Sequence, residues 1–512
     1  MNAKRRAASL LLGVLLAGCG STPSVSPGAA TPASTVTPAA TSRPTPSPTA
    51  SMAPTPTAPP AGWTYTFPEG FPEGEYVVEH PVFAPDGTAY FLAALSGTFA
   101  LDTAGRVRPG WPAPIYGEPV LGPDGSVYET DCGAVGSPCG LHRVGSDGRE
   151  LPGWPYDPGC EIAGFAVGGD GTAYVACYWA LREGEVSIVA LDDAGRERPG
   201  WPLEAKSFRD RWLGRQLVAD PDPSREPRLY LFDNQGATVT ALDPDGHVLP
   251  GWPARITGTP TYHNLARDGT VVVVSSKGDP VPRTIFTMIG PDGQTLPGWP
   301  RSVTGEVVDP TVAPDGTLYY VAPPGKLYAR DRAGNVKRGW PVAIPGVDHL
   351  HCDEKDHWSC LAVGPDGTAY LMGLSEDDSE MIIALGPDGR TLPGWPYVWR
   401  DRLEPSFGGV PSYTGYQHGR QLGLAADGTV YVAVGEPDGV AIVALDHTGR
   451  VKPGWPYRPP RRPPNPLDDT PFLPRVSSMS VGPGDRLYAF IVEGDDWITT
   501  LVVIPPDGRV AE

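Results

Sequence analysis

The stretch ALDDAGRERPGWP, residues 190–202, is repeated along the chain with only small changes. Close copies are ALDTAGRVRPGWP at 100–112, ALDPDGHVLPGWP at 241–253 and ALDHTGRVKPGWP at 444–456. A shorter phrase, APDGTAY at 84–90, alternates with the first one in similar copies. Self-similarity at a period of 41–60 residues indicates an array of equivalent structural units. The period is set by eight tryptophans: Trp111, Trp154, Trp201, Trp252, Trp299, Trp340, Trp395 and Trp455.

One unit reads as four short strands, which we name A to D in chain order. The first, at 259–266, contains Pro260, which favours an edge strand, and TVVVVSS at 270–276 is a β-branched run typical of a buried strand. Two further strands are expected at 283–290 and 294–300, and turns of the PDG type separate A from B and C from D. Helical patterns are nearly absent. Four antiparallel strands per unit predict an all-β fold, a β-propeller of four-stranded blades.

Counting the phrases predicts nine blades. The last unit, VVIPPDGRVAE at 502–512, stops before its fourth strand, and AGWTYTF at 61–67 supplies the missing piece. We therefore expect the N-terminal segment around Trp63 to close the ring, because a closed ring leaves no strand edge exposed. Each repeated tryptophan is expected to pack between neighbouring blades. Eight blades plus an appended unit is the alternative.

The segment GKLYARDRAGNVKRGW, residues 325–340, resembles the repeat of pyrroloquinoline-quinone-type propellers, G-x-L-Y-A-L-D-x-x-x-G-x-x-x-W. The resemblance covers residues 62–512 and implies the scaffold. Members of that class with quinone chemistry carry adjacent cysteines, and this chain has no Cys-Cys pair. A shared scaffold does not carry chemistry with it, so no cofactor is expected and the chain is not expected to be an enzyme.

The N-terminus predicts export. Residues 1–19 combine basic residues with a short apolar run, as in a signal peptide, and Leu16–Cys19 resembles the bacterial lipobox. The resemblance implies lipidation of Cys19 and a chain anchored to the outer face of a membrane in the cell envelope. An ordinary signal peptide with an incidental cysteine is the alternative. Residues 20–61 are rich in Ser, Thr and Pro, which predicts a disordered tether before the propeller at 62–512.

The net charge limits the possible partners, and the cysteines predict disulfides. A net charge of −19 argues against nucleic acid, and we expect a monomeric propeller with an envelope protein or glycan partner. In an exported chain the six cysteines after Cys19 predict three disulfides, Cys132–Cys139, Cys160–Cys177 and Cys352–Cys360. The rival interpretation of HLHCDEKDHWSC at 349–360 is zinc bound by His349, His351 and His357, but this spacing matches no standard site and no metal is predicted.

Loop lengths carry the functional signal. Long insertions fall only in B–C loops and in D–A links (203–216, 342–358, 397–420 and 457–476), which emerge on one face of a propeller. Aromatic and basic residues in them are typical of binding sites, although exposed decoration of the rim is the alternative. The candidates are Arg215, Arg420, Trp212, Trp399, Tyr413, Tyr416 and His418.

Two of these candidates sit in a second repeat, GRQL, at 214–217 and 419–422. In a nine-bladed ring Arg215 and Arg420 would face each other across the channel and could bind carboxylate or phosphate groups. Pairing with a local Asp220 or Asp427 is the alternative. The sequence thus predicts a binding or interaction module, with a saccharide hydrolase or lyase as the alternative function.

Overall fold

The computed structural model describes sixteen parts of the chain. They are residues 62–67, 81–93, 96–132, 139–179, 185–204, 216–233, 235–278, 281–323, 325–344, 349–350, 361–374, 379–399, 422–436, 439–460, 474–493 and 496–510. The predicted signal peptide and tether lie outside them. Among the described residues the only helical element is a 3₁₀ turn, Pro483–Asp485, and no helix there has the length and apolar character needed to span a membrane.

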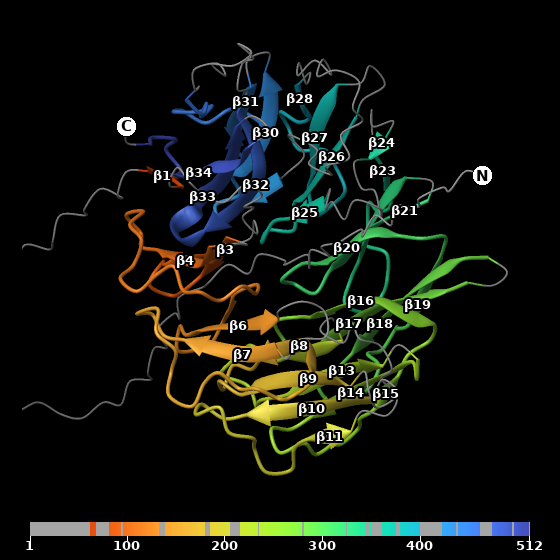
Figure 1. Ribbon diagram of the computed structural model, residues 1–512. Helices are drawn as coiled ribbons and strands as arrows, with labels where there is room; N and C mark the ends of the chain where they lie inside the picture. Colours follow the sequence, from red (N-terminus) through yellow and green to blue (C-terminus); the bar gives the residue numbers. More distant parts are fainter. Residues whose placement is uncertain are drawn as a thin grey trace, which may run out of the picture.

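The described strands form nine antiparallel sheets that follow one another around a ring, which confirms the predicted nine-bladed propeller (Figure 1). Blades 1 to 3 are β2 (Val82–Phe83), β3 (Ala89–Ala93) and β4 (Gly97–Leu101); β5 (Val120–Leu121), β6 (Val127–Cys132) and β7 (Cys139–Val144); and β8 (Glu161–Val167), β9 (Ala173–Trp179), β10 (Glu185–Leu191) and β11 (Leu203–Glu204).

Blades 4 to 6 each have four named strands. They are β12 (Leu217–Ala219), β13 (Leu229–Asp233), β14 (Thr238–Leu242) and β15 (Ala254–Arg255); β16 (Thr259–Leu265), β17 (Val271–Lys277), β18 (Arg283–Ile289) and β19 (Arg301–Thr304); and β20 (Val308–Val312), β21 (Leu318–Ala322), β22 (Lys326–Arg330) and β23 (Val342–Ala343).

Blades 7 to 9 complete the ring. They are β24 (His349–Leu350), β25 (Leu361–Val363), β26 (Ala369–Leu374), β27 (Glu380–Leu385) and β28 (Tyr397–Trp399); β29 (Leu422–Leu424), β30 (Val430–Glu436) and β31 (Gly439–Leu445); and β32 (Pro474–Gly482), β33 (Arg486–Glu493), β34 (Asp496–Ile504) and β1 (Trp63–Thr66). In blades 1, 2 and 8 the outer segment that follows the tryptophan pairs through a single bridge, Thr98–Ala113, Leu141–Tyr156 and Ile442–Tyr457 respectively.

Blade 5 shows how the sequence of each strand matches its position in the sheet. The β-branched run of β17 is buried from Val271 to Ser275, because β17 is a central strand whose two faces pack against neighbouring blades. The strand that contains Pro260, β16, is an edge strand that pairs only with β17. Its register shifts between Pro260 and Tyr262, and an edge strand with such an irregularity tolerates a proline.

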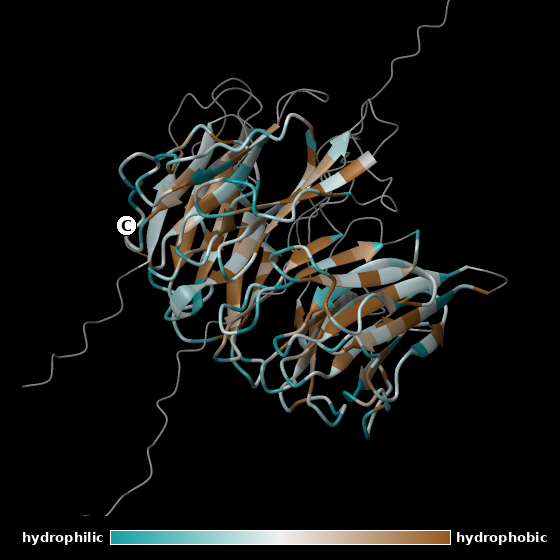
Figure 2. Ribbon diagram, turned by 90° about the horizontal axis from the view of Figure 1, so that it is seen from below, coloured by the Kyte–Doolittle hydropathy of each residue, from teal (hydrophilic) through white to brown (hydrophobic). Residues whose placement is uncertain are grey.

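Hydrophobic clusters lie between successive blades, and each of the eight repeated tryptophans is part of one of them. Trp201, for example, packs with Tyr174 of its own blade and with Leu217 and Leu229 of the next. Figure 2 shows the hydrophobic residues concentrated along the strands and the hydrophilic ones at the turns. The predicted position of the tryptophans between blades is thereby confirmed. The Trp–Pro peptide bond of each of these eight copies is cis.

The ring closes at β1, as predicted. Trp63 pairs with Val503 and Thr66 with Thr500 in an antiparallel ladder with β34. The Gly62 N–H also donates to the Arg509 carbonyl at 3.0 Å. Trp63 and Phe67 then pack with Phe91 and Phe99 of blade 1, so one N-terminal strand joins the last blade to the first.

Candidate functional site

The two faces of the ring are built differently. We call the face formed by the A–B and C–D turns the turn face. The opposite face, on which the D–A links and B–C loops begin and end, is the insertion face. This division follows from the antiparallel order of every blade, because strands A and C run toward the turn face and strands B and D run back.

Nine tryptophans tie the turn face together. In each blade the indole N–H of the tryptophan at the start of the outer strand donates to a backbone carbonyl in the C–D turn of the following blade, at 2.8–3.4 Å. The bonds run from Trp63 to Thr103, Trp111 to Ser146, Trp154 to Asp193, Trp201 to Pro244, Trp252 to Pro291, Trp299 to Arg332, Trp340 to Pro387, Trp395 to His447 and Trp455 to Pro506.

Aspartates of the A–B turns also form hydrogen bonds and ion pairs within their own blades. Asp427 accepts hydrogen bonds from the Thr429 N–H at 2.8 Å and from Lys452 Nζ at 3.2 Å. Burial alone would raise the pKa of Asp427, but the bonds from Thr429 and Lys452 outweigh it and lower the pKa below the usual range. Arg108 contacts Asp86 in the same way at 2.7 Å. A hollow of about 560 Å³ lies beside this pair and is also lined by Asp102 and Arg106.

Six of the seven candidate binding residues lie outside the described part of the chain. They are Arg215, Arg420, Trp212, Tyr413, Tyr416 and His418. The two aspartates considered as their local partners are described, and both have other cations beside them: Arg225 contacts Asp220 at 2.6 Å, and Lys452 contacts Asp427. The opposed pair Arg215 and Arg420 stays a prediction.

Trp399, the seventh candidate, ends strand β28 and is only 8% exposed. Its ring lies 5.7 Å from that of Tyr397, inside the cluster between blades 7 and 8. The outer strand of blade 7 therefore extends into the range 397–420, which the sequence assigned entirely to a link. Tyr397 and Trp399 precede the link as part of the sheet.

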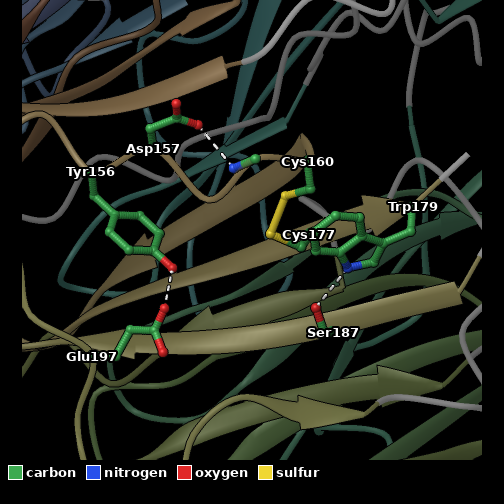
Figure 3. The surroundings of a disulfide bond; sticks show 8 residues. Tyr156, Asp157, Cys160, Cys177, Trp179, Ser187 and Glu197 are labelled. Atoms are coloured by element: carbon green, nitrogen blue, oxygen red, sulfur yellow. Dashed lines mark hydrogen bonds between the residues drawn. A yellow bond between two sulfur atoms is a disulfide. The ribbon is translucent and has the colours of Figure 1, made fainter.

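The predicted disulfide Cys160–Cys177 is present and joins the segment before β8 to strand β9 (Figure 3). Nearby, the Tyr156 hydroxyl donates to Glu197 at 2.8 Å, and the Trp179 indole N–H donates to Ser187 Oγ at 3.0 Å. Cys139 is also disulfide-bonded, and its backbone lies opposite Cys132 in the ladder of β6 and β7. Cys352 and Cys360 lie outside the described residues, so the third disulfide stays a prediction.

The histidine-rich segment begins inside a strand. His349 and Leu350 form β24, which pairs with β26, and the chain returns to the same β26 as β25, with Leu361 opposite Leu371. Strands β24 and β25 thus both pair with the same edge of β26, whereas the sequence placed residues 349–350 in a D–A link. The described residues contain no cluster of three metal-ligating side chains. His351 and His357 are not among those residues, and zinc at this segment stays the alternative interpretation.

His263 is a buried group that sequence reasoning did not single out. It lies on the innermost strand β16, and its ring stacks on that of Phe232 in blade 4, with the ring centres 3.8 Å apart. Burial lowers the pKa of His263 to about 4, so it is neutral at physiological pH and acts as a packing residue.

No protein-family model and no curated protein sequence matches this chain. Similar solved structures include one described as the eukaryotic initiation factor, at 10% identity over 80% of this chain and 94% of that one, with a TM-score of 0.49. BamB from Moraxella catarrhalis is 16% identical, with coverage of 75% and 95% and a TM-score of 0.38. Virginiamycin B lyase from Staphylococcus aureus is 10% identical, with coverage of 67% and 94% and a TM-score of 0.31. At these levels of similarity, no statement about the function of this chain rests on the neighbours.

Proposed function

We propose that this protein is an exported lipoprotein, anchored through Cys19, whose propeller binds an envelope protein or glycan on its insertion face. The observation that carries the proposal is the unequal use of the two faces. On the turn face, the tryptophan bonds join successive blades, and the aspartate–cation pairs connect the A–B turn to the outer part of the same blade. The links that differ in length from repeat to repeat all begin and end on the other face. Variable segments on one face of a repeat scaffold are the usual position of a binding site.

A photo-reactive amino acid placed on each face tests where the partner binds. Tyr116 and Val398, 44% and 50% exposed, lie toward the insertion face, whereas Val248 and Val451, 51% and 41% exposed, lie beside C–D turns. We expect irradiation of intact envelopes to give cross-linked adducts from positions 116 and 398 and none from 248 and 451. The reverse pattern would contradict the proposal.

The nature of the adduct separates the two candidate functions. A protein or glycan recovered intact supports a binding module. A saccharide that the purified chain cleaves supports the alternative, a hydrolase or lyase acting on the same face.

Lipid anchoring has its own test. We expect the wild-type chain to incorporate an alkyne-tagged fatty acid and to fractionate with membranes, because two or more acyl chains give stable anchoring. Cys19→Ser should lose the label entirely and release the chain into the soluble fraction. Ser21→Ala, two residues away, is the matched control and should keep both properties. Label retained in Cys19→Ser would rule out the lipobox interpretation.

A further inference from the structure

The joint between blades 1 and 2 contains a carboxyl group where every other blade has an apolar or aromatic side chain. Glu129 follows the tyrosine of strand B in blade 2 and is fully buried. Equivalent positions in the other blades are Phe91, Val175, Leu231, Val273, Tyr320, Leu371, Val432 and Ala489, all of them buried. Within the described ring, Glu129 is therefore the one exception at a position that serves packing between blades.

A second exception faces it from blade 1. Thr98 of β4 is fully buried, and its equivalents in the other blades are apolar: Leu141, Ile188, Val239, Phe286, Leu327, Ile382, Ile442 and Leu501. Thr98 lies two residues from Ala100 and Glu129 two residues from Val127, and both of these pack in the cluster between blades 1 and 2. Side chains two residues apart share a face of the sheet, so Thr98 and Glu129 enter the same joint from opposite sides.

The carboxyl group is incompletely hydrogen-bonded there. Glu129 Oε2 accepts from the Gly117 N–H at 3.3 Å, while Oε1 and the Thr98 hydroxyl are both buried without a hydrogen-bond partner. Gly117 belongs to the link at 115–119, which leads from blade 1 to blade 2 on the insertion face and carries the exposed Tyr116. One weak hydrogen bond does not compensate a carboxylate for the loss of water.

The other titratable groups on the elements around the joint belong to both blades and to the link. They are Tyr90 on β3, Tyr116 and Glu118 on the link, Tyr128 and Asp131 on β6, His142 and Arg143 on β7, and Glu150 after the C–D turn. Arg143 contacts Asp124 at 2.9 Å and donates to the Asp193 carbonyl at 2.7 Å. His142 is directly opposite Glu129 in the ladder, but its Nδ1 contacts Glu150 at 2.8 Å. Burial raises the pKa of Glu129 to about 8, and the hydrogen bond from the Gly117 N–H opposes this only weakly.

We propose that the joint between blades 1 and 2 is a proton-sensitive latch, in which Glu129 is held protonated and its ionisation loosens the link at 115–119 on the insertion face. The inference goes beyond the proposed function and holds whatever the partner is. The folded chain binds this proton more tightly than the unfolded chain, in which the carboxyl has its usual pKa of 4.5. The stability from the latch is therefore complete below about pH 4.5, falls as the pH rises, and is lost above about pH 8.

Two measurements on the full chain test the latch. Infrared spectroscopy should show the band of a protonated carboxylic acid at pH 6 that disappears by pH 9 in the wild type and is absent from Glu129→Gln. Hydrogen exchange, corrected for intrinsic rates, should show protection of peptides covering 111–119 falling about tenfold or more between pH 7 and pH 9. The link at 256–258, between strands β15 and β16 of blades 4 and 5, is the internal control and should keep its protection.

Two variants separate the latch from a purely structural role. Glu129→Gln stays neutral at every pH, and Glu129→Val restores the residue found at this position in blades 3, 5 and 8. We expect the link at 115–119 to keep pH-independent protection in both. If either variant lost protection with pH as steeply as the wild type, or if the wild type showed no acid band at pH 6, the proposal would be wrong. If Glu129→Gln fails to fold, the Glu129→Val variant and the wild-type infrared spectrum still test whether Glu129 is protonated and controls protection of the link.

Discussion

Replacing Trp63 with alanine should lower the free energy of unfolding by roughly 3–5 kcal/mol, the usual cost of truncating a buried tryptophan. Trp63 is 9% exposed, lies edge-on to Tyr488 in blade 9, and donates through Nε1 to the Thr103 carbonyl of blade 1 at 3.0 Å. Because it is the tryptophan that joins the last blade to the first, its loss weakens closure of the whole ring. Chemical denaturation followed by circular dichroism measures the change.

The neighbouring residue provides the control. Thr64 occupies the same strand β1 but its side chain is exposed, so Thr64→Ala should change the unfolding free energy by less than about 0.5 kcal/mol. Equal midpoints for the two variants would mean that β1 only decorates the last blade. Removal of residues 62–67 should be more damaging than either substitution, because it also leaves the β34 edge unpaired.

The fold was predictable because each of the nine blades must pack against the next one in the same way. Each blade needs the same turns and the same tryptophan between sheets, so the phrases recur and can be counted. Closure at Trp63 was predictable for a related reason. The phrase of the last unit stops before its fourth strand, and the unmatched tryptophan phrase lies at 61–67, before the first blade.

Strand boundaries near the links were harder to predict. The innermost strand of blade 7 has only His349–Leu350 and Leu361–Val363 in its ladder, too few residues for an alternating pattern to show. Tyr397 and Trp399 follow a repeated phrase but form a sheet edge whose length varies between blades. In both places non-local pairing with a neighbouring strand decides the structure, and local sequence carries little of that information.

The candidate site was less predictable still. The links differ in sequence and length from unit to unit, so the repetition that reveals the blades gives no information about the structure of the links. Glu129 shows the opposite case. Its signal was present in the sequence, since VYETDC at 127–132 places a carboxylate where the other strand-B phrases have a hydrophobic residue. The difference is visible when the nine strand-B phrases are compared residue by residue.

The blades are joined by the repeated tryptophans and also by the glycine that precedes each of them. Gly394 has a φ of +92°, and a Cβ there would lie 2.0 Å from the Thr448 carbonyl oxygen in the turn of the next blade. The same approach of backbone to backbone recurs in the other copies, at Gly110, Gly153, Gly200, Gly251, Gly298, Gly339 and Gly454. Alanine at any of them must push two blades apart, because neither backbone can move without its sheet.

We therefore expect Gly394→Ala to destabilise the protein by at least about 3 kcal/mol, combining an unfavourable φ with a backbone clash. Gly428 is the matched control: its φ is +84°, yet nothing lies within 4 Å of an added Cβ. Gly428→Ala should cost only about 1–2 kcal/mol, the conformational part alone. The difference between the two variants in urea unfolding then isolates the contact between blades. Equal losses would show that the repeated glycine serves the turn alone, and that the tryptophan joins the blades without it.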